Sequence, residues 1–165
     1  MGEMLLKKND IELIREALRL AVAFSRNQVE YYAGKHGSQH LIRMACEMGI
    51  DLHRSTIPNR LCENGHLETL VWLEAEMNFR YDQFTCFFTA IRRGQGPILE
   101  WLFKTYSVPL MKIMCATASN YGQLHVLQWL RAKGCPWDHW TVGAARDKGH
   151  VEIADWAIEN GCPTE

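Results

Sequence analysis

The sequence predicts an all-α fold in which antiparallel helix pairs stack as a short solenoid. One unit of about 28 residues recurs along the chain, its apolar residues follow helical spacing, and the alternating β-branched runs typical of strands are absent. A chain of 165 residues is long enough for one domain with a sizeable core. We therefore expect a single repeat domain spanning residues 1–165.

The repeat is clearest near the C-terminus, where GQLHVLQWLRAKGCP begins at Gly122 and GHVEIADWAIENGCP begins at Gly149. Earlier copies keep the same phase with weaker similarity. The six predicted unit starts are Asn9, Gly37, Gly65, Gly94, Gly122 and Gly149. One position of the unit is a tryptophan in four copies: Trp72, Trp101, Trp129 and Trp156. Because tryptophan is large and apolar, we expect these four rings to pack between units as the repeat core.

Each unit is expected to contain two helices. Apolar residues at helical spacing follow the starting glycine, as in GHLETLVWLEAE, and the glycine suits the left-handed end of the preceding helix. A loop and a second helix such as TVGAARDK follow, and the small residues of that helix let a neighbouring helix approach closely. A small or apolar residue stands four positions before each later unit start: Ala33, Leu61, Ala90, Ala118 and Ala145.

Several helix starts carry local signals. Asn27 followed by Glu30 has the spacing of a capping box. Pro58 is expected in the first turn of its helix, where its missing N–H costs little. The other predicted N-caps are Asp82, Asp138 and either Ser55 or Thr56.

The octapeptide GCPWDHWT, residues 134–141, is interpreted mainly as a turn. Gly134 ends one helix, Pro136 prevents its continuation, and Asp138 caps the next helix. Trp140 is expected to begin that helix and to face the stack, as Phe84 does in an earlier unit.

The pattern GHLExLxWLxxxGCPWDxWTxxxAAxxGH resembles divergent ankyrin-type repeats of giant DNA viruses, oomycetes and some algae. The last two units, residues 122–163, match closely, the central units match in part, and the first two match mostly in phase. Ordinary ankyrin repeats have about 33 residues. The resemblance therefore implies an ankyrin-like solenoid with short loops and reduced or absent β-hairpins. It also implies a scaffold that engages host or cellular proteins.

A metal site is the sharper alternative for the octapeptide. Cys135 and His139 supply two ligands, whereas a structural zinc site takes four. Cys135 and Cys162 hold equivalent positions in adjacent units, and stacked helices lie about 8–10 Å apart, which is too far for a disulfide. We expect no metal, no other cofactor and reduced thiols. The interpretation is an intracellular protein in the cytoplasm, or in the host cytoplasm or nucleus if it is viral.

Charge and motifs argue against several function classes. The net charge of −1 lacks the basic footprint of a nucleic-acid-binding protein, and no apolar run is long enough for a membrane span. Nucleophile elbows and phosphate-binding loops are absent, so we expect a protein that is not an enzyme. His66 and His150, which follow unit-start glycines, are expected to hydrogen-bond to neighbouring loops.

The predicted function is a non-enzymatic scaffold that binds a protein partner through loop tips and the concave helical face. The candidate contact residues are Arg54, Arg80, Tyr81, Arg92, Arg93, Lys112, Trp137 and His139. One alternative is a structural component, such as a virion or complex subunit, that self-associates through an open terminal repeat. The protein is then a homo-oligomer and otherwise a monomer. A second alternative is an enzyme with an unrecognised site.

Overall fold

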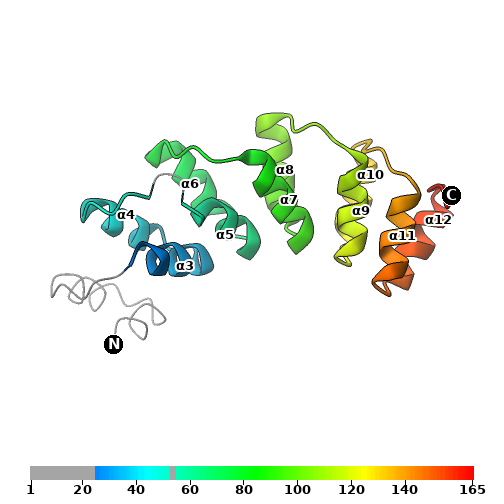
Figure 1. Ribbon diagram of the computed structural model, residues 1–165. Coiled ribbons are helices and arrows are strands. Elements are labelled where there is room, and N and C mark those ends of the chain that lie inside the picture. Colours follow the sequence, from blue (N-terminus) through cyan, green and yellow to red (C-terminus); the bar gives the residue numbers. More distant parts are fainter. Residues whose placement is uncertain (1–24, 53–54) are drawn as a thin grey trace. The chain divides into compact units, whose positions relative to one another are not determined.

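Every secondary-structure element in the described part of the chain is a helix. The computed structural model describes residues 25–52 and 55–165, which form ten helices and no strand (Figure 1). The all-α prediction is therefore confirmed for these residues. The expected first unit at Asn9 and the candidate contact residue Arg54 lie outside them. Among the described residues, no helix combines the length and the apolar character that crossing a membrane requires.

The chain divides into two compact units with a boundary between Tyr81 and Asp82. The first unit contains α3 (Arg26–His36), α4 (Gln39–Glu47), α5 (Ile57–Asn64) and α6 (Leu67–Met77). The second contains α7 (Gln83–Arg93), α8 (Gly96–Tyr106), α9 (Lys112–Asn120), α10 (Leu124–Ala132), α11 (His139–Asp147) and α12 (Val151–Glu159).

Helices that are neighbours in sequence pack as pairs inside each unit. In the first unit α3 contacts α4, α5 contacts α6, and α3 also packs against α5. In the second unit the pairs are α7 with α8, α9 with α10, and α11 with α12. There α9 also contacts both α7 and α11, so the first helices of successive pairs lie side by side.

Burial recurs at fixed distances from the unit-start glycines. The residue four positions before each glycine is completely buried at all five described starts: Ala33, Leu61, Ala90, Ala118 and Ala145. The helix after each glycine buries the residues four, five and eight positions beyond it. These residues are Leu41, Ile42 and Ala45; Thr69, Leu70 and Leu73; Ile98, Leu99 and Leu102; Val126, Leu127 and Leu130; and Ile153, Ala154 and Ala157. This spacing forms one apolar helix face, and each fully buried leucine contributes about 1.5–3 kcal/mol.

The predicted aspartate caps are confirmed. Asp82 Oδ1 accepts a hydrogen bond from the Phe84 amide at 3.0 Å, and Asp138 Oδ1 accepts one from the Trp140 amide at 3.1 Å. Each bond satisfies an amide that has no partner inside its helix. These caps fix where α7 and α11 begin.

The predicted capping box at Asn27 is wrong. Ser25 is the N-cap of α3 and forms the box with Gln28, so Asn27 already lies inside the helix. Ser25 and Asn27 both fit the sequence pattern of a capping box, and Ser25, the earlier of the two, forms the box. Glu30 takes no part in this capping box, and its carboxylate accepts a hydrogen bond from Thr56 at the start of α5. Thr56 is the N-cap of α5, and Pro58 lies in its first turn, as predicted.

The left-handed glycines receive side chains from the following helix pair. His66 Nε2 donates to the Lys35 carbonyl at 2.9 Å, which confirms the predicted histidine bond to a neighbouring turn. Gly37 has φ +63°, and a Cβ added there would lie 2.6 Å from the His66 ring. Thr69 Oγ1 also donates to the Gly37 carbonyl at 2.7 Å. A glycine at this place therefore allows both the turn and the close approach.

Candidate functional site

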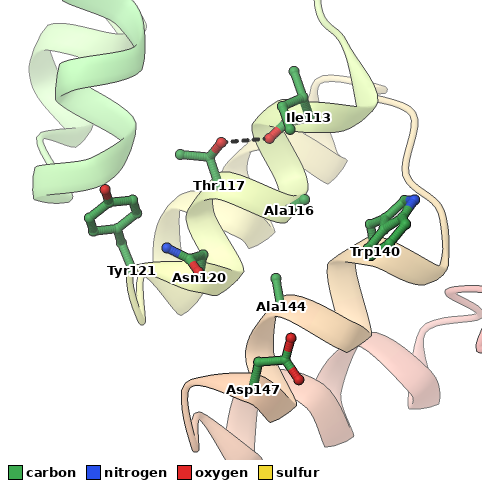
Figure 2. A pocket seen from close by; sticks show the side chains of 8 residues that line it. All are labelled: Ile113, Ala116, Thr117, Asn120, Tyr121, Trp140, Ala144 and Asp147. Atoms are coloured by element: carbon green, nitrogen blue, oxygen red, sulfur yellow. Dashed lines mark hydrogen bonds between the residues drawn. The ribbon is translucent and has the colours of Figure 1, made fainter.

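A groove on the surface of the second unit lies between α9 and α11. Its volume is about 310 Å³. Figure 2 shows the side chains that line it, which come from both helices. They are Ile113, Ala116, Thr117, Asn120, Tyr121, Trp140, Ala144 and Asp147.

Two alanines create the space in the middle of the groove. Ala116 on α9 and Ala144 on α11 both line it. Their neighbours Cys115 and Ala145 face the core and are completely buried. Small side chains at the two outward positions leave a depression where longer ones would fill it.

Trp140 and Ile113 lie toward one end of the groove, near the N-terminal ends of their helices (Figure 2). The Trp140 side chain is 65% exposed and that of Ile113 is 55% exposed. The unpartnered apolar surface that they present is far larger than a single scattered apolar residue would give.

The expectation that Trp140 faces the stack is wrong. Ala145 is in the core, and the residues three and four positions before it, Val142 and Thr141, share its helix face and are buried. Trp140 is five positions before Ala145 and therefore points well away from that face. Phe84, expected to behave in the same way, is 38% exposed, while Phe87 is completely buried.

The opposite end of the groove is polar. Asn120, Tyr121 and Asp147 lie there, at the C-terminal ends of α9 and α11 (Figure 2). Asp147 is exposed and has no ion-pair partner among the described residues. The hydroxyl of Thr117, midway along the groove, donates to the Ile113 carbonyl at 2.7 Å and so already has a partner.

Two of the predicted contact residues lie beside the N-terminal end of this groove. Lys112 begins α9, and its Nζ is 3.8 Å from Asp138 Oδ2 at the start of α11. His139 is exposed, and its ring centroid is 5.0 Å from that of Trp140. Both side chains are thus placed next to the exposed indole.

The other predicted contact residues are not gathered there. Trp137 is half-buried, with the Arg131 guanidinium 4.0 Å above its ring and the Trp156 ring 6.0 Å away. The Tyr81 hydroxyl is 3.2 Å from Glu74 Oε2. The remaining three, Arg80, Arg92 and Arg93, are exposed. Arg92 and Arg93 end α7, whereas Lys112 and His139 begin their helices.

The four repeat tryptophans are half-buried and make different contacts. Trp129 Nε1 donates to Glu100 Oε2 at 2.7 Å, and its ring lies 5.7 Å from Phe103 of α8. The Trp72 ring lies 4.8 Å from the Arg43 guanidinium of α4. These two tryptophans therefore contact the preceding helix pair, as expected. Trp156 contacts the preceding loop at Trp137, and Trp101 contacts Tyr106 of its own helix.

Glu100 is the centre of a charged cluster beside Trp129. Hydrogen bonds from Lys104, Trp129 and Lys133 lower its pKa to about 2. The carboxylate therefore stays ionised through the whole physiological range. Because the cluster lies on the second helices of its pairs, it does not line the groove between α9 and α11.

All six cysteines are free thiols, and in the described part of the chain no three histidine, cysteine or acidic residues are grouped to hold a metal. Cys135 Sγ donates to the Met111 carbonyl at 3.4 Å, and Cys162 Sγ donates to the Asp138 carbonyl at 3.3 Å. A hydrogen bond to Cys135 and burial raise the pKa of the Cys115 thiol. The Cys115 thiol is therefore protonated and unreactive at neutral pH.

A second groove, in the first unit, has a volume of about 410 Å³ and lies at the ends of α4 and α6. Its four bulky apolar lining residues are Ile50, Leu52, Met77 and Phe79; Leu52 and Phe79 are 3% and 8% exposed, whereas Ile50 and Met77 are half-buried. None of these four side chains is as exposed as Trp140 or Ile113, so this groove presents no protruding apolar side chain.

No family model and no curated protein matches this chain. Its function must therefore be argued from the groove itself. The titratable and hydroxyl-bearing side chains in the lining of the α9/α11 groove are Asp147, Tyr121 and Thr117, and the Thr117 hydroxyl already donates to the Ile113 carbonyl. The exposed aromatic and aliphatic side chains of the groove suit binding.

Sequence reasoning missed Ile113, Tyr121 and Asp147 and gave Trp140 a different role. The decisive information is which helix face α12 and α10 cover, and this depends on tertiary packing.

Proposed function

We propose that the helix pairs within each compact unit are ankyrin-like repeats of a solenoid, and that the protein is a non-enzymatic scaffold that binds a protein partner. The partner contacts the groove between α9 and α11, flanked by Lys112 and His139. The observation that carries the proposal is Trp140, an indole that is 65% exposed beside a groove of about 310 Å³.

Two further features support this assignment. The recurrence of buried positions at fixed distances from each glycine supports a repeat architecture, in which successive first helices present a shared surface. Tryptophan and tyrosine are enriched among the residues that contribute most to protein–protein affinity. The groove holds one of each, Trp140 and Tyr121, together with the exposed Ile113.

The test is affinity capture from cell lysate followed by calorimetry with each purified candidate. The groove variant is Trp140→Ala combined with Ile113→Ser, and the matched control is Val151→Ala on α12, where the side chain is likewise 65% exposed. A second variant, Arg80→Ala, tests the loop that precedes α7. Circular dichroism confirms that each variant remains helical.

The proposal expects a partner whose dissociation constant is about 30-fold higher for the groove variant and unchanged for Val151→Ala, since loss of a central tryptophan costs about 2 kcal/mol. A partner that binds the groove variant as tightly as the native chain contradicts the groove assignment. If only Arg80→Ala loses the partner, recognition lies on the loop that precedes α7.

A further inference from the structure

We propose that the α9/α11 groove takes a short peptide segment of its partner that combines a bulky apolar side chain with a lysine or arginine a few residues away. This inference rests on the proposed function, because it names the chemistry of the segment that the groove binds. The apolar side chain lies against Trp140 and Ile113, and the cationic one reaches Asp147.

The cationic preference follows from the charges at the polar end. The Asp147 carboxylate lines the groove and has no ion-pair partner among the described residues. Both α9 and α11 end there, and the C-terminal end of a helix carries partial negative charge. Arg146 and Lys148 flank Asp147 in sequence, but neither lines the groove. The groove surface at this end is therefore acidic.

The opposite end has the reverse character. The α9 and α11 helices begin there, with Lys112 and His139 beside the apolar Ile113 and Trp140. A cationic group at that end would meet the partial positive charge of two helix N-termini and the Lys112 ammonium, which is 3.8 Å from the Asp138 carboxylate. The two ends of the groove therefore differ in charge, so a bound segment has one preferred direction.

The length of the groove sets the spacing in the peptide. Trp140 and Asp147 are seven residues apart on α11, which corresponds to about 10 Å along the helix axis. An extended segment covers this distance in about three residues. The expected motif thus has a leucine or aromatic residue and a lysine or arginine separated by two to four positions.

The experiment is selection from a phage library of random 12-residue peptides against the folded full chain. Parallel selections use Asp147→Lys and, as a matched control, Asp155→Lys, which makes the same charge change at an exposed site on α12. Selected peptides are then synthesised and titrated against the native chain, Trp140→Ala and Val151→Ala.

The proposal expects native-selected peptides to be enriched in the apolar–basic motif and to bind Trp140→Ala at least about tenfold more weakly. Asp147→Lys must select acidic residues at the basic position, and Asp155→Lys must select the native motif. Peptides that depend on Trp140 but show no basic enrichment overturn this inference and leave the proposed function standing.

The remaining outcomes count against both proposals. Failure to select any peptide that depends on Trp140 overturns the groove as a peptide site. A native chain that is dimeric by light scattering, and becomes monomeric with Trp140→Ala, identifies a second copy of this chain as the occupant and overturns the peptide proposal.

Discussion

The Glu30 carboxylate accepts hydrogen bonds from Thr56, the N-cap residue of α5, which lies 26 residues further along the chain. Its Oε2 accepts a hydrogen bond from the Thr56 amide at 3.1 Å and another from the Thr56 hydroxyl at 2.8 Å. Its Oε1 pairs with Arg26 at 2.7 Å. The Thr56 hydroxyl accepts from Arg60 Nε at 3.2 Å and makes no side-chain cap to α5. Glu30 of α3 satisfies the Thr56 amide at that helix start.

Replacing Glu30 with glutamine is expected to lower the free energy of unfolding by about 1–2 kcal/mol at pH 7, since hydrogen bonds to a charged group are lost. Burial alone would raise the pKa of Glu30, but hydrogen bonds from Arg26 and Thr56 outweigh it and bring the pKa below 4.5. A lowered pKa means that the stabilisation is complete above pH 4.5 and is lost as the pH falls through the folded-state value.

Urea unfolding of the native chain and Glu30→Gln, at pH 7 and at stepwise lower pH below 4.5, measures this contribution. The difference between the two proteins must shrink toward acid. Glu76→Gln, an exposed carboxylate on α6, is the control and should change little at any pH. A Glu30→Gln difference that stays constant down to the lowest pH would refute the role of the charge.

Gly122 and Gly149 provide a matched pair for the glycine turns. Their φ values are +72° and +73°, so alanine is strained at both and is expected to cost about 1–2 kcal/mol. A Cβ at Gly122 would lie 2.9 Å from His150 Cε1, whereas nothing lies within 4 Å of one at Gly149. Thermal unfolding should therefore show a larger loss for Gly122→Ala.

The excess loss at Gly122 should disappear when His150 is also replaced by alanine, because the two sites are coupled by direct contact. Equal losses for Gly122→Ala and Gly149→Ala would show that the histidine ring moves aside without cost.

Ser107 occupies the left-handed end of α8 with φ +49°, a conformation that Gly49, Gly134 and Gly161 adopt just after α4, α10 and α12. Ser107→Gly is expected to raise the free energy of unfolding by about 1 kcal/mol, because glycine adopts this conformation without the steric cost. Gln128→Gly, at an exposed interior position of α10, is the opposite control and should lose about 0.5–1 kcal/mol. Denaturant midpoints distinguish the two, and a destabilised Ser107→Gly contradicts this account.

The features that sequence predicted correctly are those set by local chemistry. Asp82 and Asp138 cap helices because a carboxylate two residues before an amide can accept its hydrogen bond, whatever surrounds it. The helical character of each unit follows from apolar spacing in the same local way. Glycines at the unit starts adopt left-handed turns for the same reason.

The features that sequence missed depend on competition or on distant neighbours. Asn27 lost the capping role to Ser25 because two overlapping patterns compete for one helix start. The direction of Trp140 depends on which face of α11 is covered by α12 and α9, and no local pattern records that. The groove residue Asp147 was missed because a single exposed aspartate has no distinguishing spacing.

Glu100 should titrate with a midpoint near pH 2, because Lys104, Trp129 and Lys133 donate hydrogen bonds to its carboxylate. Trp129→Phe removes one donor, so the midpoint should rise toward the ordinary value of 4.5. The lowered pKa also means that the cluster stabilises the fold above pH 4.5 and loses this effect as the pH approaches 2.

Carbon-13 NMR of the Glu100 carboxyl measures the midpoint directly. Trp101→Phe is the control, since Trp101 contacts Tyr106 and leaves the bonds to Glu100 in place. An unchanged midpoint in Trp129→Phe would show that the two lysines hold the carboxylate ionised without the indole.

Replacement by alanine should lower the free energy of unfolding at Trp129 but leave it nearly unchanged at Trp140. Trp129 lies against Phe87 and Phe103 and donates to Glu100, so Trp129→Ala is expected to cost about 2–3 kcal/mol, somewhat less than a fully buried tryptophan. Trp140 is 65% exposed, and Trp140→Ala should stay within about 0.5 kcal/mol of the native chain. Urea unfolding of both variants checks this contrast. A large loss for Trp140→Ala would mean that the indole supports the fold, and the weaker binding of that variant could then no longer be assigned to the groove. A small loss leaves binding as the effect to be explained.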